Sequence, residues 1–357
     1  MHVVLAAGGT AGHIEPALNL GDAITRLDPS VTLSVLGSER GLEGTLVPSR
    51  GYVLDTVPSV PLPRKPNGDL LRLGPRLSKA VRAASAALQA RGADVVVGFG
   101  GYAAVPAYLA ARRAHIPIVI HESNARPGIA NRLGARFTPY VFETYPGTIP
   151  RARPMGVPLR QSIATLDRQA SRAEGRAYFG LDPDRPTLLV FGGSQGAVRL
   201  NAVVRDAVPA LHAEGVQVLH SFGGRNEPPS ALAGYVALPY IDRMDLAYAA
   251  ADLAMTRAGA MTCGELAAVG LPAIYVPLPI GNGEQRLNAL PVVDAGGGIL
   301  VDDGEISAEW LTQTVLGVLH DGTRLRSMSA ASYGYGVRDA DEQLARVVLE
   351  AAAGGRT

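Results

Sequence analysis

The amino-acid sequence predicts an α/β protein built from two doubly wound domains with parallel sheets. Short apolar runs alternate with helical patterns along most of the 357 residues, as in parallel strands joined by right-handed crossovers. A Pro- and Arg-rich segment at 150–158 interrupts this alternation, which then starts again, so we expect a connection between domains there. The same GGxxG spacing follows an early apolar run in each half, at Gly8–Gly12 and Gly192–Gly196.

The first half begins with an apolar run and alternates regularly up to residue 142. The predicted strands are 2–7, 31–36, 53–57, 94–98, 117–121 and 139–142. The predicted helices are 14–27, 40–49, 69–90, 102–114 and 127–135.

The second half repeats the pattern. Its predicted strands are 187–191, 216–220, 235–238, 252–256, 273–277 and 298–301. Its predicted helices are 171–179, 197–211, 243–250, 260–269, 284–295 and 307–320. A last helix near 338–352 is expected to pack back on the first domain. The first domain would then comprise 1–157 with the helix in 338–357, and the second domain would comprise 158–337.

Composition restricts the class of protein. An apolar fraction of 47% and an aromatic fraction of 5% are typical of a globular chain, and a net charge of +1 gives no global electrostatic reason to bind nucleic acid. The single cysteine, Cys263, excludes an intramolecular disulfide and fits a reducing compartment. Residues 1–5 resemble a first strand more than a signal peptide, and no apolar run approaches the ~18 residues of a membrane span. We expect a cytosolic protein or one peripheral to a membrane.

The glycine turns are the strongest functional signal in the chain. A glycine turn from a strand into a helix directs unpaired N–H groups and the positive end of the helix dipole at one point, which suits phosphate. One turn in each half predicts two phosphate-handling domains facing a common cleft. His13 directly follows the first turn and is a candidate general base; the alternative is a residue that only caps the helix or lines the cleft.

Further polar or glycine-rich clusters end other predicted strands, at 98–102 and 121–124 in the first half. In the second half, Glu265 could accept both hydroxyls of a ribose, or could simply complement the dipole of its helix. The cluster Glu284, Gln285 and Asn288 suits the hydroxyls of a sugar, and Arg160 could hold a pyrophosphate or remain a surface arginine.

No metal site is predicted. Asp302 and Asp303 are adjacent and lack the spacing of a DxD motif, and HExxH and CxxC patterns are absent from the sequence. We therefore expect chemistry without a metal or other cofactor, supported by a histidine and by helix N-termini.

Residues 62–91 are strongly basic and carry leucines between the charges. This pattern resembles a face that lies on anionic lipid headgroups, and the alternative is a solvated helix that packs its leucines on the sheet. The predicted membrane face consists of Leu70, Leu71, Arg72, Leu73, Arg76 and Lys79.

Together the motifs resemble those of the MurG family of peptidoglycan glycosyltransferases, over nearly the whole chain. The matching motifs are GGTAGH at 8–13, GFGGY at 98–102, HESNARPG at 121–128, GVPLR at 156–160, GGSQGA at 192–197, RAGAMTCGELAAVGLPAIYVPLP at 257–279 and EQRLNA at 284–289. The resemblance implies the GT-B fold, which has two Rossmann-like domains and a C-terminal helix that returns to the first. It implies transfer of N-acetylglucosamine (GlcNAc) from UDP-GlcNAc to lipid I, giving lipid II.

The resemblance also implies roles for individual residues. The turn at 192–197 would hold the diphosphate, Ile241 and Met244 would lie beside uracil, and Glu265 would take the ribose. The implied donor set is Thr10, Gly12, Asn124, Arg160, Ser194, Gln195, Gly196, Ile241, Met244, Ala260, Glu265, Glu284 and Gln285. The implied acceptor set is Gly8, Gly9, Thr10, His13, Tyr102, Glu122 and Asn124, in which His13, Glu122 and Tyr102 are the expected catalytic residues. Implied partners are UDP-GlcNAc, lipid I, the anionic inner leaflet of the plasma membrane, and cell-wall and division proteins.

Two positions depart from the family pattern. Ala11 stands where a glycine is frequent, which is acceptable if residue 11 does not need a positive φ. Glu284–Gln285 stands where Gln-Gln is frequent, and a carboxylate can still accept from sugar hydroxyls.

Three other functions compete with this one. Another enzyme of the same fold, such as a UDP-GlcNAc 2-epimerase or a natural-product glycosyltransferase, is the nearest rival. A nicotinamide-dependent oxidoreductase would need GxGxxG and an acid ~20 residues later, and the run 33–37 carries no acid. A non-catalytic nucleotide-sugar-binding protein would not need both His13 and Glu265.

Overall fold

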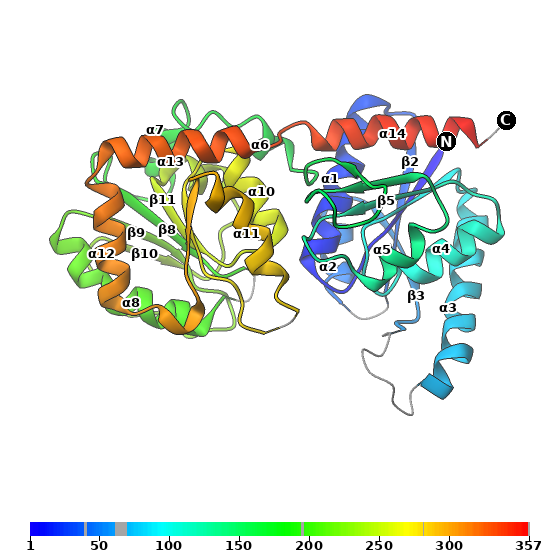
Figure 1. The fold of residues 1–357 in the computed structure, drawn as a ribbon, viewed down its shortest axis with the longest axis horizontal. Coiled ribbons are helices and arrows are strands. Elements are labelled where there is room, and N and C mark those ends of the chain that lie inside the picture. The colour runs from blue at the N-terminus through cyan, green and yellow to red at the C-terminus, as the bar shows by residue number, and fades with distance from the viewer. Residues whose placement is uncertain (39–40, 61–69, 194–195, 281, 356–357) are drawn as a thin grey trace. The chain divides into compact units, whose positions relative to one another are not determined.

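The computed structural model describes residues 1–38, 41–60, 70–193, 196–280 and 282–355, and for residues 70–72 it describes only the backbone. The chain forms two compact units (Figure 1). Unit 1 is Met1–Arg160 together with Asp339–Thr357, and unit 2 is Gln161–Arg338. Each unit is described below by itself.

Unit 1 is a parallel sheet in the order β3-β2-β1-β4-β5-β6-β7, flanked by helices. Its strands are β1 (His2–Ala6), β2 (Thr32–Ser38), β3 (Val53–Val57), β4 (Val95–Gly98), β5 (Ile118–Glu122), β6 (Tyr140–Glu143) and β7 (Arg153–Pro154). Its helices are α1 (Ala11–Leu27), α2 (Glu43–Ser49), α3 (Leu70–Arg91), α4 (Ala104–Arg113), α5 (Ile129–Gly134) and α14 (Ala340–Gly354).

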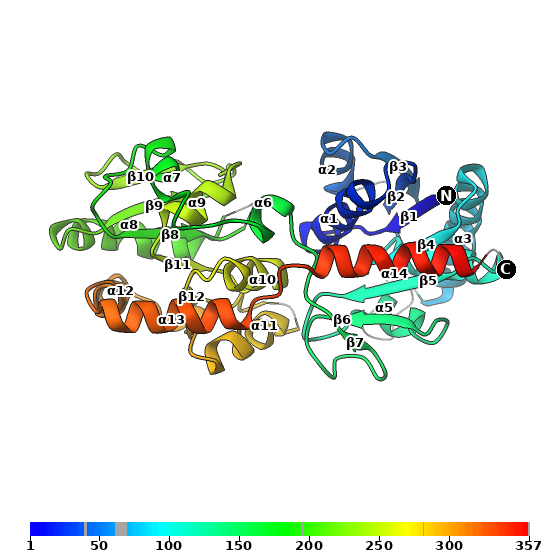
Figure 2. The same cartoon turned by 90° about the horizontal axis from the view of Figure 1, so that it is seen from above.

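The central strands of unit 1 are mainly apolar because helices cover both faces of the sheet. Along β1, Val3 and Leu5 pack in the cluster that includes α1 and α14, while Val4 and Ala6 pack in the cluster that includes α3 and α4. Helix α14 lies beside α1 and contacts β4 and β5 (Figure 2). The predicted return of the last helix to the first domain is therefore confirmed.

Unit 2 repeats this plan with the strand order β10-β9-β8-β11-β12-β13, all parallel. Its strands are β8 (Thr187–Phe191), β9 (Gln217–Ser221), β10 (Tyr235–Leu238), β11 (Leu253–Thr256), β12 (Ala273–Tyr275) and β13 (Gly298–Leu300). Its helices are α6 (Gln161–Ala164), α7 (Arg172–Tyr178), α8 (Val198–Ala213), α9 (Met244–Ala250), α10 (Ala260–Ala268), α11 (Glu284–Asp294), α12 (Ala308–Leu319) and α13 (Gly322–Tyr335), with a 3-10 turn at Asp303–Glu305.

The predicted fold class is confirmed, and three elements were not predicted. Helix α13 begins after Asp321, whose side chain accepts from the N–H groups of Thr323 and Arg324. The helix buries only Met328 and Ser332 fully, so it has no apolar periodicity that the sequence could reveal. Strand β7 and helix α6 are too short to give a periodic signal.

The Pro- and Arg-rich segment belongs to unit 1. Its residues Arg153 and Pro154 form β7 at the edge of the sheet, and its backbone is tied to the unit at two further points. His121 Nε2 lies 3.0 Å from the carbonyl oxygen of Gly156, and Asn19 donates to that of Pro158. The chain therefore leaves unit 1 only after Arg160, whereas the sequence predicted a boundary after residue 157.

Each sheet reverses its strand order beside its first strand, between β1 and β4 in unit 1 and between β8 and β11 in unit 2. Such reversal points are where doubly wound sheets bind ligands, at the carboxyl ends of the strands. The two glycine turns follow β1 and β8, so the fold places both at these points.

Candidate functional site

The glycine turn of unit 1 is compact and opens directly into α1. Gly9 has a φ of +88°, a conformation that favours glycine, and α1 begins at Ala11. A Cβ on Gly101, in the loop after β4, would overlap the carbonyl of Gly8, so the two backbones touch there. Ala11 is not among the residues with a positive φ, which explains why it can replace a glycine.

A buried carboxylate accepts a hydrogen bond from the backbone of this turn. Glu43, the first residue of α2, is fully buried, and its Oε1 accepts from Gly9 N (2.9 Å) and from Ser38 N and Oγ (3.2 and 2.7 Å). Added Cβ atoms at Gly8 and Gly41 would overlap the carboxylate, so small residues make room for it. The N–H of Gly9 is thus committed to the protein, and the N–H groups of His13 and Ile14 bond to the carbonyl oxygen of Thr10. An anion at this turn would therefore be met by the positive end of the α1 dipole.

His13 lies in the first turn of α1, half-buried. Its Nδ1 is 3.1 Å from the Thr10 hydroxyl oxygen, and a Cβ on Gly100 would lie 3.2 Å from its Nε2. Tyr102 is 46% exposed, and its ring lies against Gly9. The structure therefore brings His13 and Tyr102 together around the glycine turn, as the sequence suggested.

Glu122 and Asn124 have different environments. Glu122 is 2% exposed, and its carboxylate accepts from Asn124 N, Gly128 N and Asn131 Nδ2, each at 3.0 Å. Burial raises the pKa of Glu122. Asn124 is half-buried in the loop that this carboxylate holds. In this geometry Glu122 orders the loop 124–128, to which Asn124 belongs.

The glycine turn of unit 2 has neutral groups behind it. Gly196 has a φ of +71°, and a Cβ there would overlap the carbonyl oxygen of Phe222. That oxygen accepts from the side-chain amides of Asn201 and Asn226, both at 2.8 Å. Ser194 and Gln195 lie outside the described residues.

The segments after β10, β11 and β12 carry the other groups predicted to bind a nucleotide-sugar. Glu265 lies on α10, half-buried, and its Oε2 accepts from the hydroxyl of Tyr248 at 2.7 Å. Ala260 is the first residue of the same helix, so its N–H faces the open N-terminus. Ile241 is 3% exposed and Met244 begins α9, and both pack on the core cluster below α9 and α10.

The residues of α11 hold these loops together. Gln285 Oε1 accepts from Ala258 N and Leu278 N, at 3.2 and 2.9 Å, and Asn288 Nδ2 donates to the Ala258 carbonyl at 3.2 Å. Asn288 is 1% exposed, so it positions the loop after β11 and is not presented to a ligand. Glu284 remains half-exposed at the start of α11.

The chain matches the glycosyltransferase family 28 N-terminal domain over residues 3–142 and the glycosyltransferase family 28 C-terminal domain over residues 187–344. A protein of Streptomyces avermitilis named UDP-N-acetylglucosamine--N-acetylmuramyl-(pentapeptide) pyrophosphoryl-undecaprenol N-acetylglucosamine transferase is 59% identical over 359 residues, 99% of each chain. A Mycobacterium sp. (strain KMS) protein of the same name is 55% identical, over 99% of this chain and 97% of its own. The crystal structure of Acinetobacter baumannii MurG is similar with a TM-score of 0.79 and 28% identity, over 98% and 99% of the two chains. The chain belongs to the MurG family.

Other enzymes share the fold of this MurG family member without sharing much sequence. A UDP-GlcNAc 2-epimerase from Neisseria meningitidis aligns with a TM-score of 0.66 at 14% identity, over 98% of this chain. That likeness shows the fold alone.

Within the described ranges, none of the helices combines the length and apolar character needed to cross a bilayer.

Arg160 lies in unit 1, not in the domain to which the sequence assigned it. Its guanidinium pairs with Glu15 of α1 at 2.8 Å, and the same carboxylate lies 3.4 Å from Arg50. The ion pair fixes the end of unit 1 to the helix that starts at the first glycine turn.

The acidic pair at 302–303 is engaged by arginines. Asp302 pairs with Arg286 at 2.5 Å, and Asp303 pairs with Arg257 at 2.6 Å. Arg257 also donates to the carbonyls of Val276 and Pro277, so this pair braces the loop after β12. Among the described residues, no group of three or more His, Cys, Asp or Glu side chains is placed to hold a metal.

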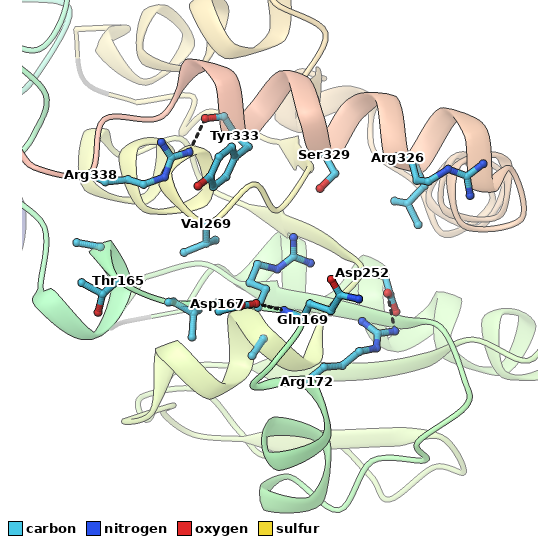
Figure 3. Close-up of a pocket in the computed structure, with 15 residues that line it drawn as sticks. Thr165, Asp167, Gln169, Arg172, Asp252, Val269, Arg326, Ser329, Tyr333 and Arg338 are labelled. Carbon is cyan, nitrogen blue, oxygen red and sulfur yellow. Dashed lines mark hydrogen bonds and ion pairs between the residues drawn. The ribbon is translucent and has the colours of Figure 1, made fainter.

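A cavity of about 840 Å³ lies elsewhere in unit 2, between α13 and the segment 164–172 (Figure 3). It is also lined by Asp252, which precedes β11, so it opens at the amino end of the sheet, opposite to the glycine turn. Its arginines already have protein partners. Arg168 donates to the carbonyls of Tyr248, Ala251 and Gly270, and Arg338 donates to that of Ala268 while its guanidinium covers the ring of Tyr333. The cavity is separate from the candidate nucleotide-sugar site.

The predicted membrane face is only partly described. Arg76 and Lys79 are exposed on α3 and Leu73 is half-buried, whereas the side chains of Leu70, Leu71 and Arg72 lie outside the description. Val81 is buried and Leu77 packs on the core of unit 1, so these two do not supply outward apolar surface.

Sequence reasoning missed three residues that hold the site together: Glu43, Asn131 and Tyr248. Each acts through a hydrogen bond to a residue 9 to 34 positions away. No local motif marks them, because the contact forms only when the loops meet in the folded unit.

Proposed function

We propose that this chain transfers GlcNAc from UDP-GlcNAc to the C4 hydroxyl of the N-acetylmuramyl sugar of lipid I, with inversion, to give the β-1,4-linked lipid II of peptidoglycan synthesis. The observation that carries this proposal is the 55–59% identity, over essentially full length, to proteins named for that transfer. The glycine turns and the side chains around them support it, since both substrates carry diphosphates.

The second glycine turn and the groups near it suit the donor. UDP gains negative charge as its bond to the sugar breaks, and the turn after β8 with the N-terminus of α8 would stabilise that charge. Glu265 would accept from the ribose, Ile241 and Met244 would lie by the uracil, and Ala260, Glu284 and Gln285 would contact the GlcNAc.

The first glycine turn suits the diphosphate of the acceptor. The N-terminus of α1 carries His13, which would take the proton of the attacking hydroxyl. We assign Tyr102 and Asn124 to acceptor binding, and Glu122 to holding the loop that carries Asn124.

We further propose that the enzyme is peripheral to the cytoplasmic face of the plasma membrane, held there by anionic lipid. The exposed Arg76 and Lys79 on α3 support this placement, and a lipid-borne acceptor requires it. Flotation with anionic liposomes tests it: Arg76→Glu with Lys79→Glu should reduce the bound fraction severalfold, and unchanged binding would contradict this role for α3.

The decisive experiment measures transfer of radiolabelled GlcNAc from UDP-GlcNAc to a short-chain lipid I analogue in the presence of EDTA. Product would establish the donor, the acceptor class and the independence from metal together. Absence of product, with UDP-GlcNAc binding seen by calorimetry, would keep the donor assignment and reject the acceptor.

A further inference from the structure

We infer that Tyr248 is a positioning residue: its hydroxyl fixes the Glu265 carboxylate for a ribose and thereby sets the preference for ribonucleotide over deoxyribonucleotide donors. This inference rests on the proposed function, because it takes the nucleotide of the donor to bind at Glu265.

The contact is short and enclosed. Tyr248 is fully buried on α9, and its hydroxyl lies 2.7 Å from Glu265 Oε2. Its ring packs against Phe191 at 6.1 Å between centroids. Phe191 is the last residue of β8, directly before the second glycine turn, so the tyrosine touches the base of the turn as well as the carboxylate.

The backbone of Tyr248 is held from the opposite side by Arg168. The guanidinium donates to the carbonyls of Tyr248 (3.1 Å) and Ala251 (2.7 Å) at the end of α9, and to that of Gly270 (2.7 Å) just beyond α10. Burial lowers the pKa of Arg168 to about 10, and the group remains a cation at neutral pH. Helices α9 and α10 are therefore joined at two points, by the guanidinium at the carbonyls of Ala251 and Gly270 and by the tyrosine hydroxyl at Glu265.

This arrangement restricts how the carboxylate can turn. An ionised carboxylate offers about four lone-pair positions, and the tyrosine hydroxyl occupies one of them on Oε2. The carboxylate then has a fixed direction, toward which the 2′ and 3′ hydroxyls of a ribose would donate. A site built in this way rejects an analogue that lacks one hydroxyl, because a buried acceptor is left unpaired.

Removing the tyrosine hydroxyl lets the carboxylate rotate and rehydrate. In Tyr248→Phe we expect the Kd of UDP, measured by calorimetry, to rise about 3–10-fold, in line with the loss of one ordinary hydrogen bond that positions the carboxylate. The Kd of 2′-deoxy-UDP should change less than about twofold, so the ratio between the two ligands falls. The kcat at saturating UDP-GlcNAc should stay within about twofold, because Tyr248 does not contact the reacting atoms.

Tyr275→Phe provides the matched control. Tyr275 is also fully buried in unit 2, on β12, and its hydroxyl has no hydrogen-bond partner in the described structure. The same chemical change there should leave both Kd values unaltered. Melting temperatures without ligand show whether either variant is unfolded.

A double-mutant cycle separates positioning from a general loss of packing. In a Glu265→Ala background, Tyr248→Phe should have no further effect on UDP affinity, whereas a packing defect would weaken UDP binding there as well. An unchanged UDP to deoxy-UDP ratio in Tyr248→Phe, or additive effects in the cycle, would overturn the inference. If the wild-type protein does not bind UDP, or if Glu265→Ala binds UDP normally, the result contradicts the proposed donor site and not the role of Tyr248.

Discussion

The two glycine turns have the same spacing and the same place in their sheets, but different groups stand behind them. In unit 1 the N–H of Gly9 is held by the buried carboxylate of Glu43. In unit 2 the turn at Gly196 packs on a backbone carbonyl that two asparagine amides hold. One turn thus has a carboxylate behind it, whereas the contacts described behind the other turn are neutral dipoles.

This difference bears on which ligand each turn suits. A carboxylate within several ångströms of a bound phosphate opposes it by about 1 kcal/mol where water reaches the pair. No such carboxylate contact is found behind the second turn among its described residues, which supports placing there the UDP whose charge grows during the reaction. The first turn carries His13 instead, which supports placing there the acceptor that must lose a proton and then leave as product.

The largest expected effect concerns the histidine that only the first turn has. His13→Ala should lower kcat about 10²–10⁴-fold with little change in the KM for UDP-GlcNAc, because a general base acts in the transition state and not in donor binding. Steady-state kinetics with a soluble lipid I analogue measures both constants. His320→Ala, an exposed histidine in unit 2, serves as control. An unchanged kcat in His13→Ala would remove the base assignment.

The next effect tests how strictly the second turn needs its glycines. Gly193 and Gly196 both have positive φ, but a Cβ on Gly193 would meet open space, whereas one on Gly196 would overlap the Phe222 carbonyl. Gly196→Ala should weaken UDP binding by about 5–150-fold. This corresponds to about 1–3 kcal/mol of backbone strain, which would displace the N–H groups that bind the phosphate.

Gly193→Ala is the control for that substitution, since it carries the φ penalty without the overlap. Calorimetry with UDP compares the two variants. Equal losses would mean that φ alone matters, and the packing of the turn on Phe222 would then have no part in donor binding.

A smaller effect is expected from making the first turn resemble the second. Glu43→Gln keeps an oxygen for the Gly9 and Ser38 donors but removes the charge. The KM for the lipid I analogue should fall about 2–5-fold, since a phosphate is no longer opposed, while the KM for UDP-GlcNAc stays constant.

Glu143→Gln is the matched control for Glu43→Gln. Glu143 is another buried carboxylate of unit 1, at the end of β6, and it accepts from the N–H groups of Gly147 and Ile149. A similar fall in acceptor KM in both variants would show that the charge of Glu43 has no specific influence on the first turn.

Whether a feature can be predicted from the sequence depends on how far apart in the chain the residues that form it lie. Strands buried on both faces are continuous apolar runs, so β1 to β6 and β8 to β13 could be located from the sequence. Helix α13 was missed because it contributes little to the core. The backbone conformation of a glycine turn is also a local property, so the two turns and the adjacent His13 are recognisable from the sequence alone.

Residues that act through distant partners were harder to interpret. Glu122 drew attention as a polar residue at a strand end, yet the fold uses it to hold the loop 124–128. Glu43 and Tyr248 carry no local signal, since their partners Gly9 and Glu265 come from other elements. The leucine-rich stretch was ambiguous for the same reason: only the packing of Val81 shows which of its apolar side chains face inward.

The smallest effect concerns Ala11, the residue that makes the first turn GGTAGH. It is the first residue of α1 and lacks a positive φ, so glycine there would gain nothing from its conformational freedom and would cost helix stability. Ala11→Gly should lower the free energy of unfolding by at most about 1 kcal/mol, seen as a shift of about 2–4 °C in melting temperature, and leave kcat and both KM values within about twofold. A severalfold gain in kcat would mean that the first turn must change conformation at residue 11 during the reaction. The turn would then be a moving part of the enzyme, and its fixed contact with Glu43 would describe only one of its states.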